Sequence, residues 1–280
     1  MALKRSKPSA ARGNVKFSKR PKMGAMSVYL ERLKELRDAW APAKRAHFRG
    51  DEQPLWFRGH QDASWKLTPK IYRPEYLGTD ENEIRNEFQS RAVQLIQGRM
   101  PADKWEWYFL MQHYGVPTRL LDWTENALIA LHFAIDNHPS DCDAGVWVLD
   151  PAWLNVKMRK GVEGAMLHDW YEAQPYLHDL EVAYEGKKVT ASVPAAIEPP
   201  HVDRRLAAQS SRFVIFGTTK DMMRTRAAYD DARKIGMVTI PQRLIEGLQE
   251  DLIHLGITSA SVFPDIFGLC QEINCKFRRR

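Results

Sequence analysis

Two segments combine many aromatic residues with hydrogen-bonding side chains, and they constrain the fold more than any other part of the chain. They read LWFRGHQDASWKLTPKIYR (55–73) and WEWYFLMQHYGVPTRLLDWT (105–124). Segments this apolar are expected to pack in a core, where polar groups cost free energy unless they are paired. The polar groups therefore predict either a functional site or a network that supports one. They are Arg58, Gln112, His113, Tyr114, Arg119 and Asp122.

Helical patterns dominate the first half of the chain. The ranges with apolar residues at helical spacing are 26–40, 81–97 and 103–114. A further helix is expected to begin near Asp122, because Asp122 and Glu125 have the spacing of a capping box. A short strand over 54–58 is expected to enter a turn at Gly59.

Short strand patterns dominate the second half. Runs of β-branched or aromatic residues bounded by Gly or Pro predict strands at 145–150, 212–217, 236–241 and 260–265. A helix is expected at 241–256, with Pro at its start and Gly at its end. Segment 155–200 has no clean period and is expected to be an irregular or partly helical insertion. Because helices and strands are segregated along the chain, an α+β fold is favoured over alternating βαβ units.

The charge of the chain is concentrated at its two ends. Residues 1–24 carry eight Lys and Arg and no acid, and residues 276–280 carry four more. Removing these twelve cations from the net charge of +6 leaves −6 for residues 25–275. We expect a disordered basic tail at 1–24, one domain at 25–275 and a basic end at 276–280. Such ends suit a polyanion such as nucleic acid, or they serve only to keep the chain soluble.

Several classes of protein are disfavoured by motifs that the sequence lacks. No apolar run is long enough to span a bilayer, and the N-terminus does not resemble a secretory signal, so we expect a cytoplasmic protein with no membrane partner. The three Cys and nine His show no metal-binding spacing, so we expect no metal site. A phosphate-binding glycine loop and a GxSxG elbow are also missing.

Five segments, in chain order, resemble the FRG domain, a family named after its Phe-Arg-Gly signature. They are WFRGHQDASWKLTPKIYR, EIRNEFQSRA, WEWYFLMQHYGVPTRLLDWTENALIALHFA, AAIEPPHVDRRLAAQSSRF and SVFPDIFGLCQEI. The most specific part is QHYGVPTRLLDWT. The chain departs from the family pattern at His60, where Gln is usual, and at Gln209-Ser210-Ser211, where Gln-x-Gly is usual.

The resemblance implies both a fold and a chemistry. Some FRG domains are similar to ADP-ribosyltransferase toxins, including RNA-modifying toxins of bacterial phage-defence systems that pair a toxin with an antitoxin and a chaperone. We therefore expect an α+β fold with a helical N-terminal part and a split, mostly antiparallel, strand-rich core that grips NAD in a cleft. On this resemblance NAD is the substrate, and an antitoxin and a chaperone are candidate partners.

The resemblance also implies roles for seven residues. The candidates for catalysis are Asp122, Glu83 and His113, and those for NAD binding are Arg58, Tyr114, Arg119 and Gln209. Arg58 would clamp a phosphate, because a guanidinium matches phosphate with two parallel hydrogen bonds. Tyr114 would stack on the nicotinamide ring, and His113 would act near neutral pH.

Each candidate has a structural alternative. Arg58 can pair with Asp122 or Glu83, and Asp122 can instead cap a helix with Arg119 as its ion-pair partner. The remaining alternatives are core packing for His113 and Tyr114, a solvated helix face for Glu83, and a loop for Gln209.

The sequence thus predicts an NAD-dependent ADP-ribosyltransferase-like toxin that modifies nucleic acid, with RNA favoured over protein. The alternative is a nucleotide- or nucleic-acid-binding module without turnover. No Glu-x-Glu or Gln-x-Glu pair lies on a late strand, which leaves the catalytic acid open and favours the alternative.

Overall fold

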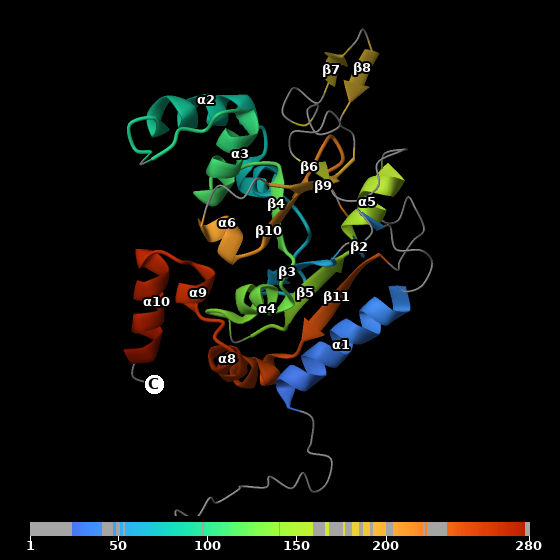
Figure 1. Cartoon of the computed structure of the whole chain (residues 1–280), viewed down its shortest axis with the longest axis vertical. Coiled ribbons are helices and arrows are strands. Elements are labelled where there is room, and N and C mark those ends of the chain that lie inside the picture. The colour runs from blue at the N-terminus through green and yellow to red at the C-terminus, as the bar shows by residue number, and fades with distance from the viewer. Residues whose placement is uncertain are drawn as a thin grey trace, which may run out of the picture.

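The fold is α+β, as expected, with helices packed on a mixed sheet (Figure 1). The computed structural model describes most of the chain from Gly24 onward, so the predicted tail at 1–24 lies almost wholly outside it. The described ranges are 24–40, 47–48, 51–52, 54–96, 98–139, 141–158, 166–167, 176, 181–184, 187–190, 193–199, 204–220, 222 and 234–277.

The central sheet has seven strands in the order β11-β5-β3-β4-β10-β9-β6. Every neighbouring pair is antiparallel except β9 with β6. The strands are β3 (Trp56–His60), β4 (Leu120–Thr124), β5 (Ala144–Leu149), β6 (Met166–Leu167), β9 (Ala195–Glu198), β10 (Ser211–Ile215) and β11 (Ile235–Ile240).

The sheet is split between β3 and β4. These two strands share a single register pair, Phe57 with Thr124, whereas β3 pairs with β5 over five residues and β4 with β10 over five. Antiparallel strands that stay together pair along their length. The sheet therefore consists of two halves, β11-β5-β3 and β4-β10-β9-β6, joined at one point.

Helices cover one face of the sheet in two groups. The first group, α1 (Ala25–Trp40), α4 (Ala127–Ile135) and α8 (Ile245–His254), packs on β5 and β11. In the second group, α3 (Lys104–His113) packs its aromatic residues on β9 and β10, and α2 (Glu81–Ala92) lies against α3. One face of the split sheet thus carries two separate cores, one for each half.

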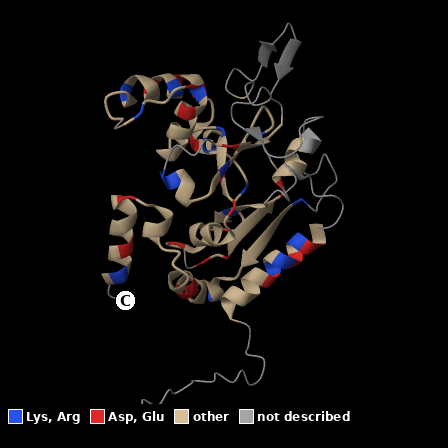
Figure 2. Cartoon of the chain, viewed as in Figure 1, with Lys and Arg blue, Asp and Glu red and all other residues tan. Residues whose placement is uncertain are grey.

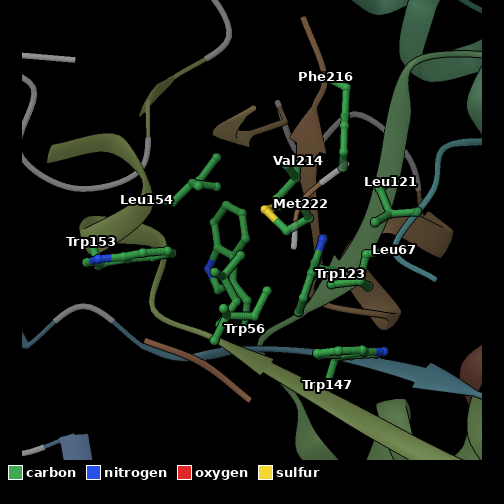
Figure 3. Close-up of a cluster of buried hydrophobic side chains, with 13 residues drawn as sticks. Trp56, Leu67, Leu121, Trp123, Trp147, Trp153, Leu154, Val214, Phe216 and Met222 are labelled. Carbon is green, nitrogen blue, oxygen red and sulfur yellow. The ribbon is translucent and has the colours of Figure 1, made fainter. Parts of the chain in front are cut away.

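The other face carries a single core that crosses the split (Figure 3). Along β10, Phe213 and Ile215 belong to the core under α3, whereas Val214 and Phe216 belong to this second core, as the alternation of a strand requires. The core includes Trp56 of β3, Trp123 of β4, and Trp153 of α5 (Pro151–Met158). Because this core touches both halves, it holds them together where backbone pairing is missing.

The remaining elements are short or lie at the periphery of the sheet. They are β1 (His47–Phe48), β2 (Asp51–Glu52), η1 (Lys70–Tyr72), η2 (Pro74–Tyr76), β7 (Glu181–Tyr184), β8 (Lys187–Thr190), α6 (Arg204–Ala208), η4 (Gln242–Leu244), α9 (Ser259–Val262) and α10 (Ile266–Phe277). Short strands therefore occupy part of segment 155–200, which was predicted to be irregular or partly helical. No helix among the described residues is long and apolar enough to cross a membrane.

The helix predicted to begin at Asp122 begins five residues later. Asp122 is the middle residue of β4, and the N-cap of α4 is Asn126, whose side chain accepts hydrogen bonds from the amides of Leu128 and Ile129. The capping-box prediction was wrong because the segment contains two residues that can cap a helix, Asp122 and Asn126. Leu121 and Trp123 pack in the core, and this packing extends the strand past Asp122.

Gly59 also differs from its prediction, since it lies inside β3 rather than in a turn. A Cβ added at Gly59 would lie 2.0 Å from the carbonyl oxygen of Ala130 and 2.6 Å from the amide nitrogen of Ala134. The glycine therefore allows the backbone of α4 to approach the strand directly. Two further predictions were also wrong. The strand predicted at 260–265 is absent, and the short helix α9 (Ser259–Val262) overlaps its first residues; α2 ends at Ala92 instead of 97.

Candidate functional site

A pocket of about 770 Å³ opens where β3 and β4 diverge, and both halves of the sheet contribute to its walls. This volume is typical of small-molecule and cofactor sites, which measure about 300–1,000 Å³. The residues that line it are Phe57, Arg58, Gly59, His60, Gln61, Trp65, Lys66, Thr68, Tyr72, Arg73, Pro74, Gln112, His113, Gly115, Asp122, Trp123, Thr124, Phe133, Arg205, Leu206, Gln209, Ser211 and Phe213.

Arg58 connects the two strands at the split. Its Nη1 donates a hydrogen bond of 2.6 Å to the backbone carbonyl of Asp122 and lies 3.7 Å from the Asp122 carboxylate. Burial lowers the pKa of Arg58 from its ordinary value, and the neighbouring Asp122 carboxylate opposes that shift. The guanidinium thus donates a hydrogen bond to a carbonyl of β4 where the backbone hydrogen bonds between β3 and β4 have ended.

His60 lies behind Arg58 and is held neutral. Arg58 Nε is 3.1 Å from His60 Nε2, and Trp147 Nε1 is 3.3 Å from His60 Nδ1. Burial, together with the positive charge of Arg58, lowers the pKa of His60 to about 3. A neutral imidazole has one acceptor nitrogen, so at any moment it accepts from one of these two donors. His60 thereby orients Arg58 without adding charge to the pocket.

Asp122 is the only carboxylate among the lining residues that the structure describes. Its side chain is 59% exposed, and its Oδ2 accepts a hydrogen bond of 2.9 Å from Gln112 Nε2. Gln112 is in turn oriented by Thr118 Oγ1, which donates to Gln112 Oε1 at 2.5 Å. The carboxylate therefore points into accessible space from a side chain whose orientation is fixed by its neighbours.

Positive charge dominates the pocket. Its walls include the cations Arg58, Lys66, Arg73 and Arg205, against the single anion Asp122. Trp65, which is 50% exposed, also lines the pocket. An exposed indole offers a flat apolar surface for stacking, and guanidinium groups bind phosphate oxygens. This combination suits an anionic ligand that contains an aromatic ring.

Four of the seven candidate residues line this pocket. They are Arg58, Asp122, His113 and Gln209. His113 is the last residue of α3, and its ring lies edge-on to Tyr114 at 4.8 Å between centroids. Gln209 Nε2 donates to the backbone carbonyl of Val262 at 3.1 Å. The structure thus brings together residues from three separate parts of the sequence.

Three candidates lie outside the pocket lining, and their expected positions need correction. Glu83 is exposed on α2, and Tyr114 is 70% exposed after the end of α3. Arg119 is buried, and its Nε donates to Glu81 Oε2 at 2.5 Å while its Nη2 donates to the carbonyl of Tyr176. Arg58 therefore pairs with Asp122, which was one of its two predicted partners, whereas Arg119 pairs with Glu81 and not with Asp122 as predicted.

The Arg119–Glu81 pair belongs to a buried network that anchors α2 to the sheet. Tyr108 donates from its hydroxyl to Glu81, and the amide of Arg119 donates to Tyr108 at 2.9 Å. Burial alone would lower the pKa of Arg119, but the nearby Tyr108 and Glu81 raise it above its ordinary value. Part of the polar content of segment 105–124 is therefore structural.

Four residues that line the pocket were not predicted from the sequence to belong to a site. They are His60, Lys66, Arg73 and Arg205. His60 was noticed only as a departure from the family pattern. A signal for Lys66 and Arg73 existed, since both lie in the same aromatic segment as Arg58. Arg205 lies in a segment that resembles the family, but its position in the pocket could not be predicted, because the fold brings it there from about 150 residues away in the chain.

Comparison with known proteins supports the resemblance to the FRG domain for the part of the chain that forms most of the pocket. Residues 53–142 match the family model of the FRG domain. No curated protein and no solved structure matches the chain. The matched range contains β3, α2, α3, β4 and α4, and therefore Arg58, Gln112, His113 and Asp122. Over residues 53–142 the chain is therefore similar to the FRG domain.

Proposed function

We propose that the pocket binds NAD and that the chain transfers its ADP-ribosyl group to a nucleic acid, with RNA as the favoured acceptor. The observation that carries this proposal is the position of Arg58. Its guanidinium lies at the split of the sheet, in a pocket with three further cations and one exposed indole. A dinucleotide has a pyrophosphate for the cations and aromatic rings for the indole, so its chemistry fits this lining.

The residues present fit NAD group by group. Arg58 is the cation best placed for the pyrophosphate, because His60 and the carbonyl of Asp122 already orient its guanidinium. Lys66, Arg73 and Arg205 supply the remaining positive charge, and Trp65 supplies a stacking surface. Preorganised charges of this kind stabilise an anion without the cost of reorienting solvent.

Asp122 is the residue that we propose as the catalytic carboxylate, which acts as a base. In the transfer, the bond between nicotinamide and ribose breaks, and the ribose carbon bonds to an acceptor nucleophile that releases its proton. A carboxylate in the pocket can accept a hydrogen bond from a ribose hydroxyl or from that nucleophile. Among the described lining residues, only Asp122 offers such a group, and more than half of its side chain is exposed.

The acceptor and the biological setting are proposed from charge and resemblance. The cations at 1–24 and 276–280 would attract a polyanion through counterion release, in a manner that depends on salt and not on base sequence. An RNA acceptor is consistent with a toxin that acts in bacterial phage defence, in the cytoplasm, with an antitoxin and a chaperone as partners.

A second candidate function is nucleotide binding without turnover. One observation favours it: the Asp122 carboxylate already accepts from Gln112 and faces Arg58 at 3.7 Å. A carboxylate that is tied to two neighbours is a weaker acceptor for a substrate hydroxyl. The pocket would then recognise a nucleotide, and the basic ends would hold nucleic acid.

Calorimetric titration with NAD, combined with transfer of label from NAD to total RNA, separates these functions. We expect NAD binding in the wild type, at least a tenfold loss in Arg58→Ala, and no loss in Arg91→Ala, which removes an exposed cation on α2. In Asp122→Asn we expect binding to persist and label transfer to fall by at least a hundredfold. Binding without nicotinamide release in the wild type would favour the second function. Absence of NAD binding would refute NAD both as a substrate and as a ligand that is bound without turnover.

A further inference from the structure

The C-terminal helix α10 packs on the protein through its small and polar side. A Cβ at Gly268 would lie 2.1 Å from the carbonyl oxygen of Phe263, so this glycine is in direct contact with the end of α9. Glu272 accepts hydrogen bonds from the hydroxyl of Thr258 and, at 3.2 Å, from the amide of Ala260. The acidic side chain of the helix is therefore turned towards the protein.

The opposite side of α10 is apolar and exposed. Ile266, Leu269, Ile273 and Phe277 follow the i, i+3, i+7 and i+11 spacing that places side chains along one stripe of a helix. In Figure 2 most of α10 is uncharged, since its twelve residues include one acid and one base. The exposed fractions are 77% for Ile266, 65% for Phe267, 46% for Leu269, 46% for Ile273 and 73% for Phe277. A surface helix normally shows the reverse arrangement, with its apolar stripe buried.

The exposed stripe is large enough for an interface between two identical helices. Weighting typical side-chain areas by the exposed fractions gives roughly 500 Å² of apolar surface for the four residues of the stripe together with Phe267, which lies beside it. This lies in the upper part of the range of about 300–600 Å² for the largest patch on a monomer, and such patches often mark binding sites. Two copies would bury roughly 1,000 Å² in total, near the lower limit for a specific interface.

We propose that this stripe binds a second copy of the chain, with the two α10 helices packed antiparallel about a two-fold axis. A parallel arrangement would bring the Lys276 side chains of both copies together. The antiparallel arrangement instead places Lys276 near Asp265 of the partner subunit, which is the acid that precedes the helix. Charge complementarity and the two-fold symmetry common among homodimers therefore favour the antiparallel arrangement.

Cys270 is a natural probe of this arrangement. It is exposed and lies four residues after Ile266 and three before Ile273, within the apolar stripe. In an antiparallel pair centred on the helix, the two copies of Cys270 are offset by about 4–5 Å along the axis. With helix axes about 9 Å apart, their Cα atoms are about 6–7 Å apart, at the upper end of the range for a disulfide. Cys275 lies five residues further on, away from the stripe.

Sedimentation of the full chain over about 1–300 µM tests the proposal, because this range covers the micromolar dissociation constants of weak self-association. We expect a reversible monomer–dimer equilibrium in the wild type. Ile273→Asp should weaken it at least a hundredfold, because it places a charge at the centre of the stripe. Leu95→Asp, which changes a 76% exposed leucine elsewhere, should dimerise as the wild type does. Equal melting temperatures of the two variants would confirm that both are folded.

Oxidation by copper phenanthroline gives an independent readout. We expect a covalent dimer in the wild type and in Cys275→Ser, and none in Cys270→Ser or Ile273→Asp. A wild type that stays monomeric at about 300 µM, or an Ile273→Asp variant that still dimerises, would overturn the proposal. Binding to phosphatidylglycerol vesicles without self-association would also overturn it, because the stripe would then serve a lipid surface.

Discussion

Replacement of Gly59 by alanine provides the most direct test of how α4 is held on the sheet. The new Cβ would lie 2.0 Å from the carbonyl oxygen of Ala130, 2.6 Å from the amide nitrogen of Ala134 and 3.1 Å from the carbonyl carbon of Phe133. All three atoms belong to the backbone, so no side chain can rotate to relieve the contact. The methyl group fits only if α4 moves away from β3.

The cost of that movement follows from the packing of α4. Inserting a methyl group into a well-packed core costs about 1–3 kcal/mol when side chains can adjust. Here the helix itself must shift, and four of its apolar residues are buried against the sheet and α8: Ala130, Leu131, Ala134 and Ile135. We therefore expect a loss of at least about 3 kcal/mol in the free energy of unfolding, or about 6–12 °C in melting temperature.

Urea denaturation monitored by tryptophan fluorescence measures this loss, with Gly247→Ala as the control. A Cβ at Gly247 in α8 would have only Ala25 within 4 Å, at 3.9 Å, and alanine has the higher helix propensity. The control should therefore be more stable than the wild type by about 0.5–1 kcal/mol. A Gly59→Ala protein within 1 kcal/mol of the wild type would refute the close approach of α4 to β3.

Three further predictions concern polar groups that stabilise the fold. Glu81→Gln should destabilise the chain by about 3–5 kcal/mol in urea denaturation, because it leaves the buried Arg119 without its charge partner. Burial lowers the folded-state pKa of His60 from 6.5 to about 3, so the unfolded chain binds more protons between these values and stability falls as the pH drops through this window. In His60→Gln, the stability lost between pH 7 and pH 5 should be about 2 kcal/mol smaller than in the wild type, and equal losses would contradict the neutral state of His60. Asn126→Ala should cost about 1 kcal/mol in melting experiments, whereas no change would argue against its role as the cap of α4.

Much of the secondary structure could be predicted from the sequence where local signals are strong. The helix at 26–40 is α1, the helix at 103–114 is α3, and the strands at 145–150, 212–217 and 236–241 are β5, β10 and β11. Each of these segments has an apolar pattern that persists over its length, or breakers at both ends. The α+β fold followed from the segregation of helices and strands and is confirmed.

The errors occurred where tertiary contacts overrode a local signal. Asp122 reads as a helix cap, but the packing of Leu121 and Trp123 on the core places it in the middle of a strand. Gly59 reads as a turn, but the backbone of α4 requires a glycine inside a strand at that position. The residues that neighbour Asp122 and Gly59 in the sequence do not reveal either of these tertiary contacts.

The sequence by itself determined the similarity of residues 53–142 to the FRG domain and the presence of polar groups that needed partners in a core. Only the tertiary structure decided which partner each group has: Arg58 meets Asp122 at the split and lines the pocket, whereas Arg119 meets Glu81 and is buried beside Tyr108. The physical reason is that a buried charge requires an opposite charge within a few ångströms. Spacing along the chain does not encode that distance, because the pairing of strands and the packing of helices set it.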